Sequence, residues 1–110
     1  MTIERRSDER KRISRPVVYA GTDGSAGNDA QGVGLALDIS PSGMMLESDA
    51  PIDARNIRVR ATTRGGASVE VDGVLIYSMP YSSGRYRTGL KFAGPDEQVS
   101  TFVAELGKPV

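Results

Sequence analysis

The alternation of apolar and polar residues along this chain constrains its fold more than any other feature. In segment 56–63 every second residue is apolar, namely Ile57, Val59 and Ala61. Side chains two apart in a strand point the same way, so this period predicts a β-strand with one buried face. Segment 64–67 contains two glycines, and the alternation resumes over residues 68–74. The three segments together predict a β-hairpin that belongs to a larger sheet.

Similar strand patterns recur along most of the chain, separated by turn residues. We expect six strands, at about residues 16–20, 33–40, 43–48, 56–63, 68–78 and 85–93. Residues 21–32 form a long glycine-rich loop between the first two, and residues 81–84 form a later turn. Six short strands with turn signals predict an all-β fold, either a small antiparallel barrel or a sandwich. Closing the sheet into a barrel removes exposed edges.

One helix is expected after the last strand, at about residues 95–106. Pro95 suits the first helical position, and the acidic residues that follow it favour a helix N-terminus. The apolar residues then recur with the i, i+3, i+4, i+7 spacing of one helix face, at Val99, Phe102, Val103 and Leu106. We expect this face to cover the core of the sheet.

The composition excludes several classes of function. The chain has 110 residues with 14 basic and 14 acidic side chains, which favours one globular domain. It has no cysteine and no histidine, so disulfides, zinc sites and hydrolytic triads lose their usual residues. We therefore expect no metal, no cofactor and no catalysis. No apolar run reaches the roughly 20 residues of a membrane helix, and the first residues resemble no secretory signal, so a cytoplasmic location is expected.

Residues 1–15 form a basic segment ahead of the predicted barrel domain, which spans 16–110. Six basic and three acidic residues give this segment a formal charge of +3. It has little apolar content to bury, so we expect a flexible arm. Such an arm suits an anionic partner, although a solvated tail explains the charge equally well.

The arm contains one Arg-x-x-x-Arg motif, Arg6-Ser-Asp-Glu-Arg10. Arg6 and Arg10 lie on one side of the chain in either a helical turn or an extended segment. A guanidinium group binds phosphate with two parallel hydrogen bonds and stacks on bases. The two arginines could therefore hold one anionic ligand, and the alternative is a plain solvated charge run.

A second motif, Asp38-Ile-Ser-Pro-Ser-Gly43, stands at the end of the strand 33–40. Strict alternation puts the apolar side chains on one face and Asp38 with Ser40 on the other; the apolar set is Val33, Leu35, Leu37 and Ile39. Aspartate can accept hydrogen bonds from the N1–H and amine of guanine, and the hydroxyl can bind a base or phosphate. Gly43 would let a flat ligand approach the backbone. Ordinary turn chemistry explains the same three residues.

The two motifs together resemble the signature of the PilZ domain, a bacterial receptor family for cyclic di-GMP. In this chain the signature comprises Arg6, Arg10, Asp38, Ser40 and Gly43. The late strand around Thr88-Gly-Leu-Lys-Phe92 and the closing helix are also similar to PilZ domains. The resemblance implies a six-stranded antiparallel β-barrel with one C-terminal helix.

The resemblance also implies a binding mechanism. Arg6 and Arg10 would hold the phosphates and contact guanine, while Asp38 would read a guanine edge, Ser40 would add a hydrogen bond and Gly43 would permit contact. The ordered arm would then signal to a downstream protein partner, as expected for control of motility or biofilm formation.

Two further residues and two alternative functions stay open. Arg5 or Arg12 could assist the binding of the ligand. A small barrel could instead bind single-stranded nucleic acid through a patch of Arg58, Arg60, Arg85 and Arg87. Only 5% of residues are aromatic and none is tryptophan, so stacking platforms are scarce. A scaffold that binds only protein is the other alternative, and intact motifs count against it.

Overall fold

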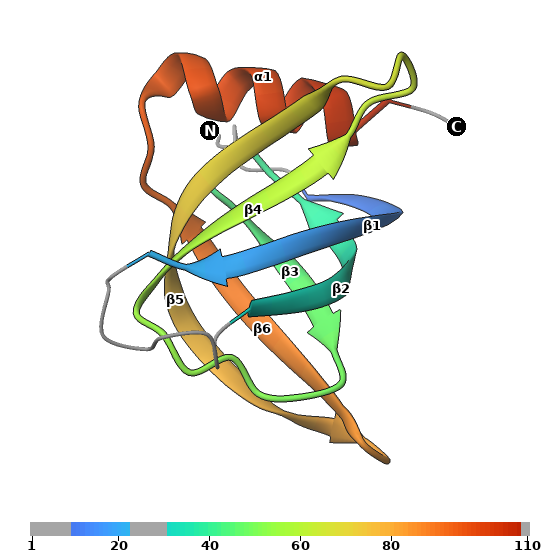
Figure 1. Ribbon diagram of the computed structural model, residues 1–110, viewed down its shortest axis with the longest axis vertical. Helices are drawn as coiled ribbons and strands as arrows, with labels where there is room; N and C mark the ends of the chain where they lie inside the picture. Colours follow the sequence, from blue (N-terminus) through green and yellow to red (C-terminus); the bar gives the residue numbers. More distant parts are fainter. Residues whose placement is uncertain (1–9, 23–30, 109–110) are drawn as a thin grey trace, which may run out of the picture.

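The computed structural model describes residues 10–22 and 31–108. Six antiparallel strands close into a barrel in the order β1-β2-β3-β6-β5-β4, and one helix follows them (Figure 1). The elements are β1 (Lys11–Gly21), β2 (Gln31–Ile39), β3 (Gly43–Ser48), β4 (Asn56–Thr62), β5 (Ser68–Ser82), β6 (Arg85–Phe92) and α1 (Asp96–Leu106). The predicted barrel and helix are confirmed.

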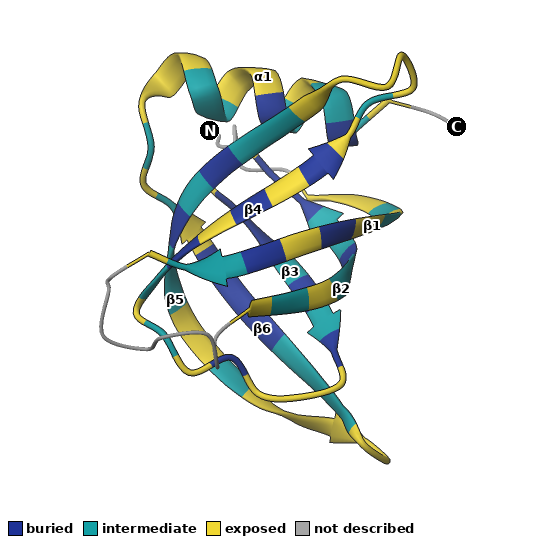
Figure 2. Ribbon diagram, in the orientation of Figure 1, coloured by how far each residue is buried: buried dark blue, intermediate teal, exposed yellow. Residues whose placement is uncertain are grey.

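The barrel interior is filled by the apolar residues of the alternating strands. In β4, Ile57, Val59 and Ala61 are buried while the residues between them are exposed, and Figure 2 shows these alternating bands. Val71 of β5 and Leu46 of β3 add fully buried side chains to the same cluster. Each of these strands therefore presents one face to the core, as the period of two predicts.

Helix α1 lies across one end of the barrel (Figure 1). Its buried residues are Phe102 and Leu106, and the Phe102 ring meets Phe92 of β6 edge-on with centroids 6.2 Å apart. Pro95 is the N-cap, with ψ 149°, so the helix begins one residue later than predicted. The apolar stripe covers the core as expected.

Two strands are longer than the sequence predicts. β1 begins at Lys11, five residues before the expected start at Pro16, because the backbone of 11–15 pairs with β2 despite its charged side chains. The Arg15 guanidinium donates to the carbonyl of Glu105 at 3.3 Å and to that of Thr62 at 3.1 Å. β5 runs to Ser82, which leaves a two-residue turn with Gly84 at φ +69°.

The strict alternation predicted for β2 is wrong. Ala36 pairs with Leu46 of β3, but the next pair joins Asp38 to Met45, so β2 carries one extra residue there. This β-bulge changes which side chains face inward. Ala36 is fully buried and Val33 is 73% exposed, the reverse of the expectation.

Candidate functional site

The structure brings Arg10 from the first motif onto Asp38 of the second. β1 and β2 pair antiparallel with Arg12 opposite Asp38, so the chain just before β1 runs past the end of β2. Arg10 Nη1 lies 2.5 Å from Asp38 Oδ1. The Arg10 side chain is 58% exposed and that of Asp38 is 19% exposed. The carboxylate is thus held against the barrel while the guanidinium remains open to solvent.

Ser40 and Gly43 form the turn that follows Asp38. The Ser40 hydroxyl oxygen accepts hydrogen bonds from the backbone N–H of Ser42 at 3.3 Å and of Gly43 at 3.2 Å. The Ser40 N–H donates to the Gly43 carbonyl at 2.9 Å. Ser40 is buried, so its hydroxyl serves the turn that fixes the end of β2.

Gly43 has a packing role in the barrel. A Cβ added there would stand 2.2 Å from the carbonyl oxygen of Leu90 in β6, which is far inside contact distance. Glycine is therefore required for the close approach of β3 to β6. A ligand contact at Ser40 or Gly43 stays a prediction.

The other predicted arginines divide into two groups. Arg12 is exposed at the position opposite Asp38, on the strand next to it. Arg5 and Arg6 lie outside the described residues, as does most of the glycine-rich loop 21–32. Arg10 and Arg12 are therefore the predicted site arginines that the described residues include, together with Asp38, Ser40 and Gly43.

Asp38 stands at one end of a row of residues that crosses four strands on the outer face of the barrel. Its partner in β3 is Met45, Met45 pairs with Gly89 of β6, and Gly89 pairs with Tyr77 of β5. These positions face outward because their strand neighbours face the core, for example Thr88 and Leu90 on either side of Gly89. We call Asp38, Met45, Gly89 and Tyr77 the outer row.

The outer row and an exposed lysine beside it were not predicted from the sequence. Lys91 of β6 is exposed and pairs in register with Gly43, one outward position beyond Gly89. The period-two pattern identifies which residues of a strand face outward, but it does not fix the register between strands. The signal that could have found Tyr77 and Lys91 is the pairing of 68–82 with 85–92.

The arginines proposed for a nucleic-acid patch are mostly paired with carboxylates. Arg58 Nε lies 2.7 Å from Asp72 Oδ1, and this hydrogen bond and the negative charge of Asp72 raise the pKa of Arg58 above its ordinary value. Arg85 pairs with Glu47 at 3.2 Å and with Asp49. Arg87 Nε lies 3.5 Å from Glu47 Oε2. Arg60 is the remaining arginine of the patch. Local carboxylates neutralise most of this candidate patch.

Within residues 10–22 and 31–108, no cluster of three or more acidic side chains has a geometry suited to a metal ion. The single helix in the same described ranges is too short and too polar to cross a membrane.

Comparison with known families decides the classification. A family model for the PilZ domain matches residues 4–106, which include both motifs. The chain belongs to the PilZ domain family. PilZ domains are receptors for cyclic di-GMP and are not catalysts, in agreement with the sequence analysis.

Solved PilZ structures share the fold of this chain at low sequence identity. The PilZ domain of CeSA from a cellulose-synthesizing bacterium has a TM-score of 0.66 at 17% identity, covering 91% of this chain and 99% of that one. The PilZ domain of YcgR from Escherichia coli with c-di-GMP has a TM-score of 0.61 at 14% identity, covering 94% of this chain and 92% of that one. K. pneumonia MrkH in its c-di-GMP complex has a TM-score of 0.65 at 18% identity, covering 94% of this chain and 52% of MrkH.

This PilZ chain thus spans about half of MrkH and of Bacillus subtilis MotI/DgrA, an inhibitor of motility. A search of curated proteins finds no match to the sequence.

Proposed function

We propose that this PilZ chain binds cyclic di-GMP on its outer face, beside Asp38. The observation that carries the proposal is the contact between Arg10 and Asp38, since it joins the two signature motifs in one place. Membership of a receptor family and the fold shared with c-di-GMP-bound YcgR and MrkH support it.

In the proposed complex, Asp38 exchanges its guanidinium partner for a guanine edge. The carboxylate accepts hydrogen bonds from the adjacent N1–H and amine donors of the base. The Arg10 side chain is more than half exposed, and such an ion pair contributes only about 0–1 kcal/mol. Releasing it therefore costs little, and the freed Arg10 can bind a phosphate bidentately with a stronger, charge-assisted geometry.

The remaining signature residues complete the proposed site. Arg6 binds the second phosphate, and Arg12 or Arg5 adds positive charge near the dinucleotide. Ser40 and Gly43 hold the end of β2 so that Asp38 is already oriented before binding. Preorganisation of this kind improves affinity because less ordering is required on binding.

The proposed signal is a rearrangement of the segment that leads into β1. When Arg10 moves from Asp38 to a phosphate, the backbone before Lys11 moves with it and presents a new surface to a downstream protein partner. Amide hydrogen exchange checks this step: protection of residues 1–10 should rise when cyclic di-GMP is added. Equal exchange with and without the dinucleotide would refute the signalling step.

Titration calorimetry of the purified chain with cyclic di-GMP tests the binding itself. We expect micromolar or tighter affinity for the wild type and loss of binding in Asp38→Ala. Asp49→Ala is the matched control, since Asp49 is also an outer carboxylate that pairs with an arginine, Arg85, but it lies elsewhere on the barrel. It should bind as the wild type does.

GTP and a single-stranded oligonucleotide serve as competing ligands in the same titration. A wild type that ignores micromolar cyclic di-GMP and binds the oligonucleotide would overturn the proposal. The carboxylates paired with Arg58, Arg85 and Arg87 argue against that outcome.

A further inference from the structure

We infer that the outer face of β1 and β2 is a docking surface for an acidic amphipathic helix of a protein partner. This surface is centred on β1, whereas the outer row crosses the barrel from β2 to β5. β1 stands three places from β6 around the closed ring of strands, and Figure 1 shows β1 in front and β6 behind. The inference therefore goes beyond the proposed binding of cyclic di-GMP and does not depend on it.

The surface is apolar where the outer face of a sheet is ordinarily polar. Val17 and Tyr19 of β1 are buried, so the residues that alternate with them point outward. Those residues and their register partners in β2 form what we call the apolar face: Pro16, Val18 and Ala20 in β1 with Leu35 and Val33 in β2. Val33 is 73% exposed and Val18 is 44% exposed. Contiguous exposed apolar side chains are typical of an interaction surface, whereas single ones are ordinary.

The next two strands show that this composition is particular to β1 and β2. The outward residues of β4 and their register partners in β5 are all polar, namely Arg58 with Asp72, Arg60 with Glu70 and Thr62 with Ser68. An antiparallel sheet with one solvated face normally alternates between apolar and polar residues in this way. The apolar face departs from that pattern on the side of the barrel next to β4.

One cation at the border of the apolar face has no carboxylate of its own. Arg60 is exposed and pairs in register with Val18, so it stands directly beside the face. Its neighbour Arg58 holds both nearby carboxylates, with Nε 2.7 Å from Asp72 Oδ1 and 3.3 Å from Glu70 Oε1. No carboxylate of residues 10–22 or 31–108 forms an ion pair with Arg60. A partner that covers the apolar face can supply this carboxylate.

The apolar face is hollowed beside Arg60. A pocket of about 600 Å³ opens there, and Val18, Ala20, Val33 and Arg60 are among its lining residues. Apolar walls with a cation at the border suit a group that has an apolar body and a carboxylate close to it. A leucine and a glutamate three or four residues apart on one helix provide this pair, because such side chains are neighbours on the helix surface.

The backbone pairing around the face restricts the kind of partner. At Val18, β1 pairs with β2 on one side and with β4 on the other, so an added strand finds no free sheet edge there. A partner must therefore bind through side chains, as an amphipathic helix laid on an apolar surface does. Pro16 and Ala20 are about 13 Å apart along β1, and residues i and i+7 of a helix are about 10.5 Å apart. Two turns of an apolar helix stripe thus cover the face.

A second copy of this chain fits the face less well than an acidic helix does. The buried residues of α1, Phe102 and Leu106, already pack against the barrel. The carboxylate on the β3 side of the face belongs to Glu47, which is paired with Arg85 and Arg87. These described elements of a second copy offer neither a free apolar stripe nor a free carboxylate.

Nuclear magnetic resonance of the isotope-labelled chain tests the inference with two synthetic helices. The first is an amphipathic peptide of about 18 residues with a leucine stripe flanked by glutamates, which is long enough to form a helix in water. The second has lysine in place of every glutamate. The acidic peptide should shift the amide resonances of residues 16–20 and 31–35 with a Kd below about 1 mM, and the basic peptide should bind at least about tenfold more weakly.

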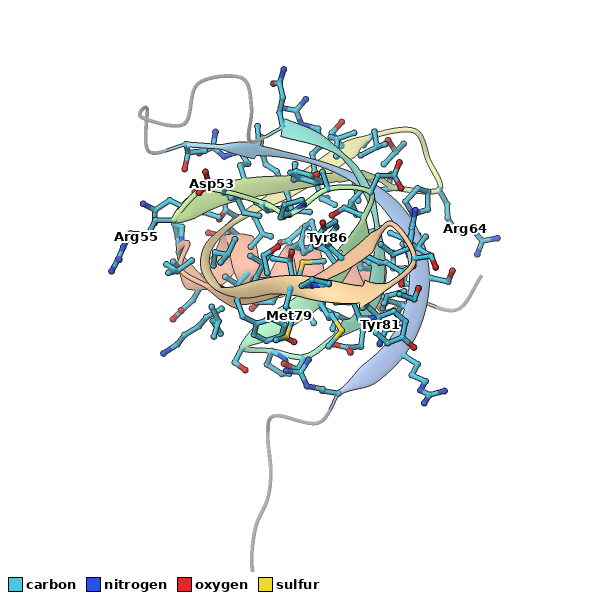
Figure 3. All side chains as sticks on the ribbon, turned by 90° about the horizontal axis from the view of Figure 1, so that it is seen from below. Asp53, Arg55, Arg64, Met79, Tyr81 and Tyr86 are labelled. Atoms are coloured by element: carbon cyan, nitrogen blue, oxygen red, sulfur yellow. The ribbon has the colours of Figure 1, made fainter. Side chains whose placement is uncertain are left out.

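Variants separate specific recognition from general adhesion. Arg60→Glu should lose about tenfold or more in affinity for the acidic peptide and should gain affinity for the basic one. Arg64→Glu makes the same change of net charge at another exposed arginine, which points away from the barrel in Figure 3, and should bind both peptides as the wild type does. Val33→Ser should weaken binding of the acidic peptide. Ile76→Ser is its matched control, since Ile76 is 63% exposed but belongs to β5.

Three results of the titrations would overturn the inference: residues 16–20 and 31–35 do not shift, the two peptides bind equally, or a folded Arg60→Glu keeps the preference of the wild type. A dimer in sedimentation analysis that Val33→Ser abolishes would also overturn it, because a second copy would then cover the face. Thermal denaturation verifies the fold of each variant.

The docking surface and the dinucleotide site can fail separately. Asp38→Ala should bind the acidic peptide as the wild type does, and Val33→Ser should bind cyclic di-GMP as the wild type does. A wild type that binds the peptide but ignores cyclic di-GMP would remove the proposed function and support the docking surface. The opposite result would remove the docking surface alone.

Discussion

Arg10 and Asp38 are 28 residues apart in the sequence, and their side chains meet at 2.5 Å at the end of β2. The antiparallel pairing of β1 with β2 produces this contact, since it places Arg12 opposite Asp38 and leaves Arg10 just beyond the ladder. The only described arginine of the first motif thus lies on the acidic residue of the second.

Replacement of Arg10 by alanine should remove dinucleotide binding and leave the fold almost unchanged. The lost ion pair is solvent-exposed, so the free energy of unfolding should fall by no more than about 1 kcal/mol. Urea denaturation and calorimetry with cyclic di-GMP measure the two quantities. Arg64→Ala, an exposed arginine in the β4–β5 turn, is the control and should change neither. Undiminished affinity in Arg10→Ala would contradict the proposed exchange of partners.

Gly43→Ala should destabilise the barrel by about 1–3 kcal/mol, because its Cβ would collide with the backbone carbonyl of Leu90. A backbone oxygen within a strand pair moves far less readily than a side chain. Gly65→Ala is the matched control, since its Cβ would meet only the Thr63 hydroxyl at 3.9 Å. Urea midpoints of the two variants decide the matter, and equal midpoints would show that Gly43 has no packing role.

Gly89→Ala should reduce affinity for cyclic di-GMP more than it reduces stability. The new Cβ would displace only the far end of the Tyr77 side chain, which can rotate away at modest cost. Rotation moves the ring off Gly89 and changes the shape of the outer row beside Asp38, where the dinucleotide is proposed to bind. Calorimetry measures the affinity for cyclic di-GMP, and thermal denaturation of the same sample measures the stability. Full affinity in this variant would mean that the position of the ring is unimportant for binding.

Phe102→Ala should cost about 3–5 kcal/mol of stability, as is usual for a fully buried phenylalanine. The ring joins α1 to Phe92 and closes one end of the core. Thr101→Ala tests the neighbouring exposed position and should be nearly neutral. Chemical denaturation followed by circular dichroism measures both variants. A small loss in Phe102→Ala would show that the helix is dispensable for the barrel.

The success of sequence reasoning differs between strands for a physical reason. In β4 each face is uniform along its length, so the period of two identifies Ile57, Val59 and Ala61 as core residues. In β2 the extra residue between Ala36 and Asp38 is set by pairing with β3, and no pattern inside β2 reveals it. The charged start of β1 was likewise missed because ladder hydrogen bonds depend on the backbone of the neighbouring strand.

The candidate site shows the same division. Asp38 and Arg10 belong to motifs that are contiguous in the sequence, so they could be identified directly. Tyr77 and Met45 become neighbours of Asp38 only through the register of three strand pairs. Register depends on bulges and turn lengths, which hydropathy does not determine. A search restricted to short motifs therefore finds Asp38 and misses the rest of the outer row.

The β1–β4 pair closes the barrel, and its short length affects how a displacement of Arg10 would spread into β1. β1 pairs with β4 only from Val18 to Gly21, and the backbone of its first residues pairs with β2 alone, while the Arg15 side chain donates to the carbonyls of Thr62 and Glu105. The backbone from Lys11 to Arg15 can therefore separate from β2 while β1 stays paired with β4, provided that the two Arg15 hydrogen bonds are also broken. A ligand that binds Arg10, as proposed, would therefore act on the part of β1 whose backbone has a partner strand on one side only, and the other strand pairs of the barrel would keep their register.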